Sequence, residues 1–508
     1  DEDLVEGEEG FRRGTGRGVA VEPAPGGPAL RSSEPEGVFT SAPLQASAPF
    51  THVGLHWSAG VPANTSLSFE VRTSGDGSNW SPWTTVAVES LPEETPADEY
   101  FGALVYAGGA QFVQYRATFR TRGGASPILR KVTATLIDSP GAATTSNQLP
   151  TTAVTDADSQ RTLAVTNRGQ WGADESYRFS RRGAEVWPEM FVPTKKLIVH
   201  HTATRNDYAS AAEAAAEVRA IYRYHAVTQR WGDIGYTALV DKFGNVYEGR
   251  HGRGEGTGRE ILSAGVVAGH DFHHNYGSAG VALLGDATQR SWPMSGASGP
   301  MWETLVRYSV FESGRHGLRP LKEGKTTQTS DADIAASDFL RSDDLWSNGM
   351  RNVSGHRETN ATACPGDPVM ALLDELRGAI HAGLVDTSRT GVSLRNTAPG
   401  GRETTVNTRI TYEWTPEPPE SGWTLVGYEY CFEGWYKPIR SYDIDYRGGY
   451  TTGDQPRPQW TSAVATTTSA SFTPTKPGHY TFHVRAILRN GTAERRSAYA
   501  GDHTFLVQ

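Results

Sequence analysis

Hydrophobic and polar residues alternate along two stretches of the chain, one near each end. Between about Val38 and Asp138, segments such as THVGLHW, SLSFEVRT, QFVQYRATFR and RKVTATLID place apolar side chains at every second position. The same period returns toward the end of the chain, in TRITYEW, LVGYEYCF, SASFTP, HYTFHVRAI and DHTFLV. This period is typical of strands with one buried face, and turn residues separate the segments. Both stretches predict all-β sandwich domains, the second of immunoglobulin or fibronectin type.

The middle of the chain has another pattern, in which compact apolar runs alternate with helical stretches. KKLIVHH and AGVALLGD have strand length, and GYTALVDKFGNVYEGR predicts two strands around the turn KFGN. An Ala-, Glu- and Arg-rich stretch predicts a helix over about Ser210–Val227, capped by Asn206 or Asp207. Further helices are expected at about 300–316 and 367–382. Alternating strands and helices indicate an α/β domain.

Changes in composition mark the boundaries between these stretches. The first residues mix Gly, Pro, Glu and Arg with few large apolar side chains, which predicts a flexible tail. Two stretches rich in small polar residues predict linkers. The predicted layout is a flexible tail (1–36), a β-sandwich (37–140), a linker (141–160), a central α/β domain (161–385), a second linker (386–405) and a second β-sandwich (406–508).

Charge and hydropathy exclude two classes of partner. The 508 residues carry a formal net charge of -9, which argues against a nucleic-acid binder because such a protein needs a basic surface. No apolar run approaches the ~18–20 residues of a membrane helix, so no membrane span is predicted. The sequence begins with Asp1 rather than Met, which predicts a processed form, left either by removal of a secretory signal or by recombinant expression. The Arg-, Ala- and Gly-rich composition is typical of a high-GC bacterial source.

Three side chains of the middle stretch have metal-ligand chemistry. His200 ends the strand KKLIVH, His356 lies in VSGHRE, and Cys364 lies in TACPG. Gly355 and Pro365 bracket the last two and predict a loop, which can turn both side chains toward one point. Two histidines and one cysteine make three protein ligands, the number typical of catalytic zinc, where water takes the fourth position. The spacing alone leaves a structural role open, because a lone cysteine is most often buried and inert.

Six segments, in order, resemble the zinc-dependent N-acetylmuramoyl-L-alanine amidases of the peptidoglycan recognition protein family. They are RGQWGADES, LIVHHTAT, IYRYHAVTQRWGDIGY, VYEGR, AGHDFHHNYGSAGVALLGD and SGHRETNATACPG, and they span roughly residues 165–380. The resemblance implies a zinc ion (Zn²⁺) held by His200, His356 and Cys364. It also implies that the first histidine of the HHT motif is the ligand, so His201 is not chosen.

The resemblance also implies roles for residues around the metal. Tyr236, in WGDIGY, matches the catalytic tyrosine, whose hydroxyl would hydrogen-bond the attacking water or the developing oxyanion. A core tyrosine is the alternative. Thr362 is expected to assist catalysis through a hydrogen bond. Four residues are expected to line or support the substrate cleft: Trp231, His225, His270 and Asn275.

Four features leave alternatives open. Glu358 is the carboxylate nearest to the candidate ligands in sequence, and it is either a general base or a salt-bridge partner. Asp271 stands where small residues are common in relatives, which changes the expected cleft wall. His225 is equally consistent with a buried histidine on the helix. The histidines His270, His273 and His274 form a weaker rival metal cluster.

The expected function is that of a secreted zinc amidase that cleaves the bond between N-acetylmuramic acid and the L-alanine of the peptidoglycan stem. The alternatives are a module that binds peptidoglycan without cutting it and a zinc peptidase acting on cross-links. The flanking β domains are expected to bind a wall polymer or a protein partner, or to act as spacers. Trp80 and Trp83, with Trp57, form either an aromatic platform for sugars or part of a core.

Overall fold

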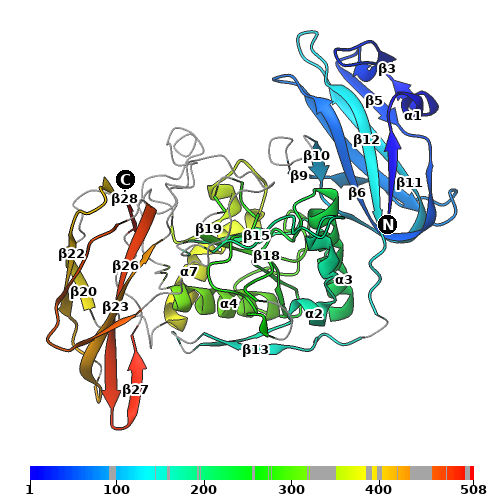
Figure 1. Ribbon diagram of the computed structural model, residues 1–508. Coiled ribbons are helices and arrows are strands. Elements are labelled where there is room, and N and C mark those ends of the chain that lie inside the picture. Colours follow the sequence, from blue (N-terminus) through cyan, green and yellow to red (C-terminus); the bar gives the residue numbers. More distant parts are fainter. Residues whose placement is uncertain are drawn as a thin grey trace.

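The computed structural model consists of a central α/β unit between two all-β units (Figure 1). Within the described part of the chain, every helix is too short or too polar to cross a bilayer. The structure describes all residues except 91–98, 143–144, 157–158, 160, 192–193, 195, 255–257, 273, 276, 317, 319, 321–350, 385–391, 397–402, 420, 435–459, 476–477, 498–503 and 508.

The N-terminal unit is a network of twelve hydrogen-bonded strands with one main core. The four long strands coincide with the alternating segments of the sequence, and Trp57, Phe69 and Tyr115 pack against one another inside. The strands form one continuous network, and the all-β sandwich stays a prediction for this unit. Its elements are β1 (Glu2–Glu6), α1 (Glu8–Arg13), β2 (Thr15–Arg17), β3 (Val19–Glu22), β4 (Ala29–Ser32), β5 (Glu36–Thr40), β6 (Leu44–Gly60), β7 (Ser66–Ser74), β8 (Thr84–Val86), β9 (Val88–Ser90), β10 (Tyr100–Gly102), β11 (Val105–Arg120) and β12 (Ile128–Ile137).

The predicted flexible tail, residues 1–36, is wrong. Strand β1 pairs antiparallel with β12, from Glu2 opposite Leu136 onward, and β2, β3 and β4 join the same network. Phe11 of α1 is buried and packs edge-on against Phe39 at 5.7 Å. The segment has few large apolar residues because it forms short strands whose pairing partners lie far along the chain, and the single aromatic side chain anchors it.

The tryptophans of this unit do not form an open platform. Trp57 is 2% exposed and belongs to the core. The guanidinium of Arg72 lies over Trp80 at 4.9 Å and over Trp83 at 4.6 Å, and that of Arg116 lies over Trp83 at 4.7 Å. These cation–π contacts occupy ring faces that a sugar would need.

The central unit is built on a five-stranded sheet in the order β17-β16-β18-β15-β19. Strands β16, β18, β15 and β19 run parallel, and β17 pairs antiparallel with β16. The expected strands and helices are present. Its elements are β13 (Thr152–Thr155), β14 (Thr162–Val165), α2 (Arg168–Trp171), η2 (Glu175–Arg178), β15 (Lys196–His201), α3 (Ala211–Arg223), η3 (Tyr224–Thr228), β16 (Ala238–Val240), β17 (Val246–Glu248), β18 (Ser278–Leu283), α4 (Pro300–His316), β19 (Val353–Gly355), η7 (His356–Glu358), α6 (Asp367–Ala371) and α7 (Leu373–Gly383).

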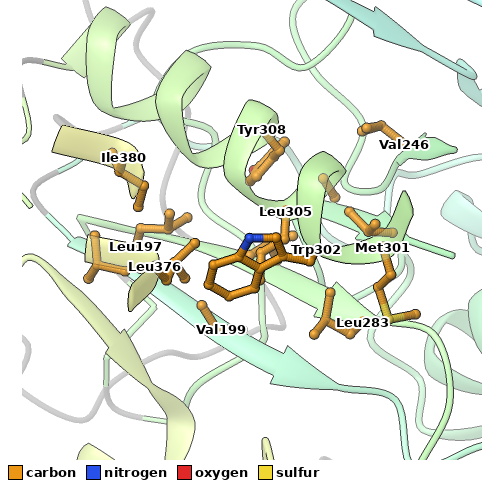
Figure 2. Packing of buried hydrophobic residues seen from close by; sticks show 14 of the residues in the cluster. Leu197, Val199, Val246, Leu283, Met301, Trp302, Leu305, Tyr308, Leu376 and Ile380 are labelled. Carbon is orange, nitrogen blue, oxygen red and sulfur yellow. The ribbon is translucent and has the colours of Figure 1, made fainter. Parts of the chain in front are cut away.

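Helices cover both faces of this sheet. Successive strand residues point to opposite faces of the sheet, so alternate residues are buried in two different hydrophobic cores. Figure 2 shows one core, where Trp302 and Leu305 of α4 pack with Leu197 and Val199 of β15 and Leu376 of α7. On the other face, residues of α3 pack with alternate residues of β16 and β18. The sheet is therefore buried on both sides, and its strand ends are the part left to form a site.

Both predicted linkers contain ordered strands. Strand β13 lies inside 141–160 and pairs with β14, and the backbone carbonyl of Ser146 accepts a hydrogen bond from the first residue of α3 at 3.0 Å. Strand β20 (Val392–Asn396) lies inside 386–405 and pairs with β22 of the C-terminal unit. The described parts of both stretches are thus attached to their neighbours, and the exact domain boundaries stay predictions.

The C-terminal unit has two sheets that share one core. Tyr412 of β22 stacks on Phe482 of β26 at 4.2 Å, and Trp414 packs edge-on against Tyr428 at 5.6 Å. The alternating segments of the sequence form the strands of both sheets. After β20 they are β21 (Glu403–Thr404), β22 (Ile410–Pro416), β23 (Thr424–Gly434), β24 (Thr461–Val464), β25 (Ser469–Phe472), β26 (Gly478–Asn490), β27 (Ala493–Arg496) and β28 (Thr504–Val507).

Helix α3 joins the N-terminal unit to the central unit through buried polar contacts. Glu217 Oε1 lies 3.0 Å from His52 Nε2 and 2.6 Å from Arg205 Nε, and the Glu217 and His52 side chains are each 1% exposed. Burial alone would raise the pKa of Glu217, but His52 and Arg205 together lower it, so the carboxylate is ionised. The Tyr224 hydroxyl, just beyond the helix, donates to the carbonyl of Gly102 at 2.9 Å. The two units therefore share an interface built like a protein interior.

Replacing Glu217 by alanine is expected to destabilise the full chain by about 3–5 kcal/mol, because Arg205 loses its buried counter-charge and His52 loses the carboxylate beside it. The measurement is chemical denaturation of the full chain. Glu213→Ala is the matched control, since Glu213 lies on the same helix and also contacts Arg205, at 2.9 Å, but is 32% exposed. It should cost about 1 kcal/mol or less. Equal losses for the two variants would contradict the prediction.

Candidate active site

The candidate metal ligands meet because two parallel strands end at the same edge of the sheet. Strand β15 pairs with β19 so that Val199 lies opposite Gly355. The next residues are His200, which is on β15, and His356, which begins η7. The register therefore places the two histidines side by side, with ring centroids 4.5 Å apart. The loop after η7 returns Cys364 to the same edge. In open α/β sheets, ligands bind at this carboxyl edge.

The ligand atoms of His200, His356 and Cys364 all lie within 4.8 Å of one another. Cys364 Sγ lies 3.7 Å from His200 Nδ1 and accepts a hydrogen bond from the His201 backbone N–H at 3.3 Å. His356 Nδ1 is buried and has no hydrogen-bond partner among the described residues. One thiol and two imidazole nitrogens around one point are a donor set that suits zinc, and the orphaned Nδ1 fits a metal ligand.

Burial keeps the two histidines in the protonation state that a ligand needs. It lowers the pKa of His200 well below its ordinary value and also lowers the pKa of His356, so both imidazoles are neutral. Burial raises the pKa of the Cys364 thiol. A divalent cation is what would compensate a thiolate in this position, so metal binding should release a proton.

The Nε2 atoms of the two candidate ligand histidines, His200 and His356, each lie close to a further polar side chain. His200 Nε2 lies 3.0 Å from His270 Nδ1, and His356 Nε2 lies 3.7 Å from Asp271 Oδ1. Gly280 leaves room for this arrangement, because a Cβ there would lie 2.2 Å from the His270 ring. A carboxylate behind a ligating histidine orients the ring and raises its basicity. Asp271 therefore acts on the ligand shell, whereas the sequence predicted a place for it on the cleft wall.

Asp271 is itself fixed by several donors. Its carboxylate accepts hydrogen bonds from Thr359 Oγ1 at 2.8 Å and from Asn360 Nδ2 at 2.5 Å. Its backbone N–H donates to Asn275 Oδ1 at 2.8 Å. Burial would raise the pKa of Asp271, but the neighbouring histidines lower it overall, so the group is a carboxylate. Asn275 thus supports this network as well as lining the cleft.

Replacing Asp271 by asparagine is expected to weaken zinc binding by about 10–100-fold, since the amide no longer orients and polarises His356 as a carboxylate does. Competition with a chromophoric chelator measures the zinc affinity directly and does not depend on turnover. Asp207→Asn is the control, because the Asp207 side chain is 80% exposed and lies 3.8 Å from Arg205 rather than beside a candidate ligand. Equal affinity in wild type and Asp271→Asn would contradict the prediction.

Tyr236 is placed over the ligands by a tight turn. Its ring centroid is 5.7 Å from that of His200, and its side chain lines the cleft. Gly235 precedes it, where a Cβ would lie 2.8 Å from the carbonyl oxygen of Gly269 and 2.9 Å from the Trp231 ring. Burial raises the pKa of Tyr236 well above its ordinary value, so the hydroxyl stays a hydrogen-bond donor.

His225 and Trp231 form one side of the same cleft. The helix predicted over Ser210–Val227 begins one residue later, with Ser210 itself as the cap, and changes to a π-helical turn from Tyr224. This turn carries His225, whose ring lies 4.7 Å from Trp231 and 5.7 Å from Tyr236. π-Helical turns frequently occur at functional sites.

The remaining candidate residues differ in whether they lie at the cleft or in structural contacts elsewhere. Thr362 lines the cleft, and its Oγ1 accepts a hydrogen bond from the Cys364 backbone N–H at 3.2 Å. Glu358 accepts from the Gly355 backbone N–H at 2.8 Å and lies 3.5 Å from Arg377, which is a structural pairing. In the rival histidine cluster, His273 lies outside the described residues. His201 points away, where its Nδ1 accepts from the Ala287 backbone N–H at 3.0 Å.

The cleft around these residues has a volume of about 400 Å³. One part of its wall was not predicted from the sequence: Ala87, Val88, Glu89, Ser90 and Ala103 of the N-terminal unit line it together with the candidate ligands. No motif in these positions marks them, because they reach the cleft only through the packing of one unit on another.

The metal-free protein is expected to lose stability as the pH falls from about 6.5 toward 4. Burial lowers the pKa of His201 and that of His270 to about 4 from 6.5. The unfolded chain therefore takes up protons below about pH 6.5 while the folded imidazoles remain neutral, and acid favours unfolding. Thermal denaturation of chelator-treated protein between pH 7.5 and 4 measures this. His270→Gln should show a shallower decline; a wild-type melting temperature that is flat between pH 6.5 and 4.5 would contradict it.

Fold and site together define an α/β domain with a candidate three-ligand metal centre at the carboxyl edge of its sheet. No family model matches the chain. It is similar to the N-acetylmuramoyl-L-alanine amidase of Homo sapiens, with 31% identity over 219 residues, which are 43% of this chain and 28% of that protein. It is similar to peptidoglycan-recognition protein SC1a of Drosophila melanogaster, with 26% identity over 218 residues, 43% of this chain and 86% of the relative.

Among solved structures, Drosophila PGRP-LB wild-type has 19% identity, covers 41% of this chain and 91% of its own, and gives a TM-score of 0.28. The chain spans just over a quarter of the length of the human amidase. The sequence matches confirm the resemblance that the motifs indicate: this chain carries a region homologous to N-acetylmuramoyl-L-alanine amidases and peptidoglycan recognition proteins.

Proposed function

We propose that this protein is a secreted, zinc-dependent N-acetylmuramoyl-L-alanine amidase that cleaves peptidoglycan between N-acetylmuramic acid and the L-alanine of the stem peptide. The observation that carries the proposal is the cluster of His200, His356 and Cys364, with ligand atoms within 4.8 Å of one another on an open cleft. Homology to a human protein named for this activity supports it.

Zinc held by these three side chains would supply Lewis acidity at the scissile carbonyl. The chain's own residues bind and orient the substrate. The Tyr236 hydroxyl, kept protonated by burial, donates a hydrogen bond to the carbonyl oxygen as negative charge develops there. Thr362 Oγ1 accepts from the Cys364 backbone, which leaves its hydroxyl proton to donate into the cleft. His270 and Asp271 hold the ligating rings from behind.

The flanking units are proposed to be β-sandwich modules that hold the catalytic unit on the wall, by binding a wall polymer or a protein partner. The two sheets around the Tyr412–Phe482 stack support the sandwich architecture of the C-terminal unit. The covered faces of Trp80 and Trp83 argue against a sugar platform at those two rings.

The test is digestion of purified peptidoglycan by the zinc-loaded full chain, with mass spectrometry of the soluble products. Stem peptides with a free L-alanine amino terminus are expected, lost on chelation and restored by zinc. His381→Ala, an exposed histidine on α7, is the control and should behave as wild type. Bound zinc without any release of stem peptides would indicate a recognition module. Products cut within the peptide cross-links would indicate a peptidase. Either result overturns the proposal.

A further inference from the structure

The N-terminal unit supplies a fixed wall of the cleft. Strand β9 pairs antiparallel with β10, and the Ala103 backbone N–H donates to the carbonyl of Ala87 at 2.8 Å. The Ser90 hydroxyl donates to Gln229 Oε1 of the central unit at 3.0 Å, and the Ser90 side chain belongs to a buried residue. The wall is therefore held from both units, and the side chain between these anchors, Glu89, lines the cleft.

The orientation of Glu89 follows from its partner His225. Glu89 Oε1 lies 3.0 Å from His225 Nε2, while His225 Nδ1 accepts a hydrogen bond from the Gly235 backbone N–H at 3.2 Å. Since Nδ1 is an acceptor, Nε2 carries the proton and donates to Glu89. Glu89 thus accepts a hydrogen bond from His225, is 21% exposed at its side chain, and is held beside Trp231 and Tyr236 by this contact.

The acidic and basic side chains that line the cleft have one sign of charge. Among the described residues that line it, Glu89 and Asp286 are acidic and none is lysine or arginine. Asp286 lies on another part of the wall, 3.6 Å from His201 Nδ1. Zinc bound at His200, His356 and Cys364 would add positive charge at that part of the cleft, so the effect of Glu89 is local to the ligand groups that lie beside it. A ligand carboxylate near Glu89 is therefore repelled, whereas a carboxamide of the same shape is not.

We infer that Glu89 is a specificity-determining residue, contributed by the N-terminal unit, that favours stem peptides with an amidated carboxyl group over stems with the free carboxylate. The inference rests on the proposed amidase function, because it takes the stem peptide as the ligand of this cleft. An acidic residue of a stem peptide presents either a carboxylate or a carboxamide, and the two differ in charge far more than in size. The cleft therefore discriminates by charge.

The experiment compares two synthetic N-acetylmuramoyl peptides that differ only in a carboxylate or a carboxamide on the residue after L-alanine. Zinc-loaded wild type is expected to show a kcat/KM about three- to tenfold higher for the amide at low salt, mainly through KM. The preference should shrink as ionic strength rises, since salt screens a partly exposed charge. Glu89→Gln should bring the ratio close to one, and Glu89→Asp should retain the preference.

The glutamine variant keeps a side-chain oxygen that can accept from His225, so the wall should stay folded, and thermal denaturation checks this. Glu36→Gln is the control, because Glu36 belongs to the same unit and pairs with Arg120 on its surface. A wild-type ratio near one, or an unchanged ratio in Glu89→Gln, would overturn the inference. If the wild type cleaves neither compound, the amidase proposal fails. The role of Glu89 is then decided separately, by calorimetry of the binding of the two compounds. The ratio of their two dissociation constants is compared between wild type and Glu89→Gln.

Discussion

Replacing Cys364 by alanine is expected to abolish both zinc binding and peptidoglycan hydrolysis. Cys364 is the one candidate ligand of the three that would bind the metal as an anion, a thiolate, and its Sγ lies 3.7 Å from His200 Nδ1 at the cleft. Loss of an outer-shell partner already weakens metal binding by about 10–100-fold, so loss of a ligand should weaken it further. His200→Ala should have the same effect. Metal analysis after gel filtration and product release from peptidoglycan measure the two losses separately.

The matched control is Cys431→Ala. Cys431 is also buried, but it lies on β23 of the C-terminal unit and is not part of the candidate metal cluster. This variant should keep its zinc and its rate of hydrolysis. A Cys364→Ala protein that retains one equivalent of zinc and full turnover would show that the cluster is not the catalytic metal site.

Replacing Tyr236 by phenylalanine is expected to lower kcat by about 10²–10³-fold, the effect of removing one donor aimed at a developing oxyanion. Zinc content and KM should change little, because the ring remains and the hydroxyl acts on the transition state. Burial raises the pKa of Tyr236 well above its ordinary value, so its contribution should show no inflection between pH 6 and 9.

Tyr222→Phe tests whether any buried tyrosine would give this result. The Tyr222 ring is buried against α2 and its hydroxyl donates to the carbonyl of Asp174 at 3.1 Å, away from the cleft. Its loss should cost stability but leave kcat near the wild-type value. If Tyr236→Phe keeps more than half of the wild-type kcat, the hydroxyl is not the oxyanion donor.

The sequence predicts the ligand cluster well because its signal is local. His200 lies near the end of a strand, and His356 and Cys364 flank a short loop, so parallel strands bring the two histidines together and the loop returns Cys364 to them. The helix before His225 is also predicted, but its last turn is a π-helix, which composition does not reveal. Asp271 is expected on the cleft wall, since nothing in its sequence neighbourhood shows that it lies behind His356.

The features that the sequence did not predict share one physical cause, which is contact between segments far apart in the chain. Residues 1–36 look unstructured because their strands gain stability from pairing with strands such as β12, and not from their own apolar content. Glu89 reaches the cleft because one unit packs on the other, and its partner His225 is far along the chain. A periodicity argument describes which face of a strand is buried, but it does not say against what.

The interface at α3 sets how this protein can be divided or recombined. Glu217 shares its buried charge with His52, and Tyr224 hydrogen-bonds to the backbone of Gly102. A gene fragment that begins after the N-terminal unit would therefore encode a central unit in which Glu217 loses its contact with His52 and the cleft is open on one side. When such units are recombined, whether by evolution or in the laboratory, the first two should therefore be exchanged together, and the natural crossover point lies after α7.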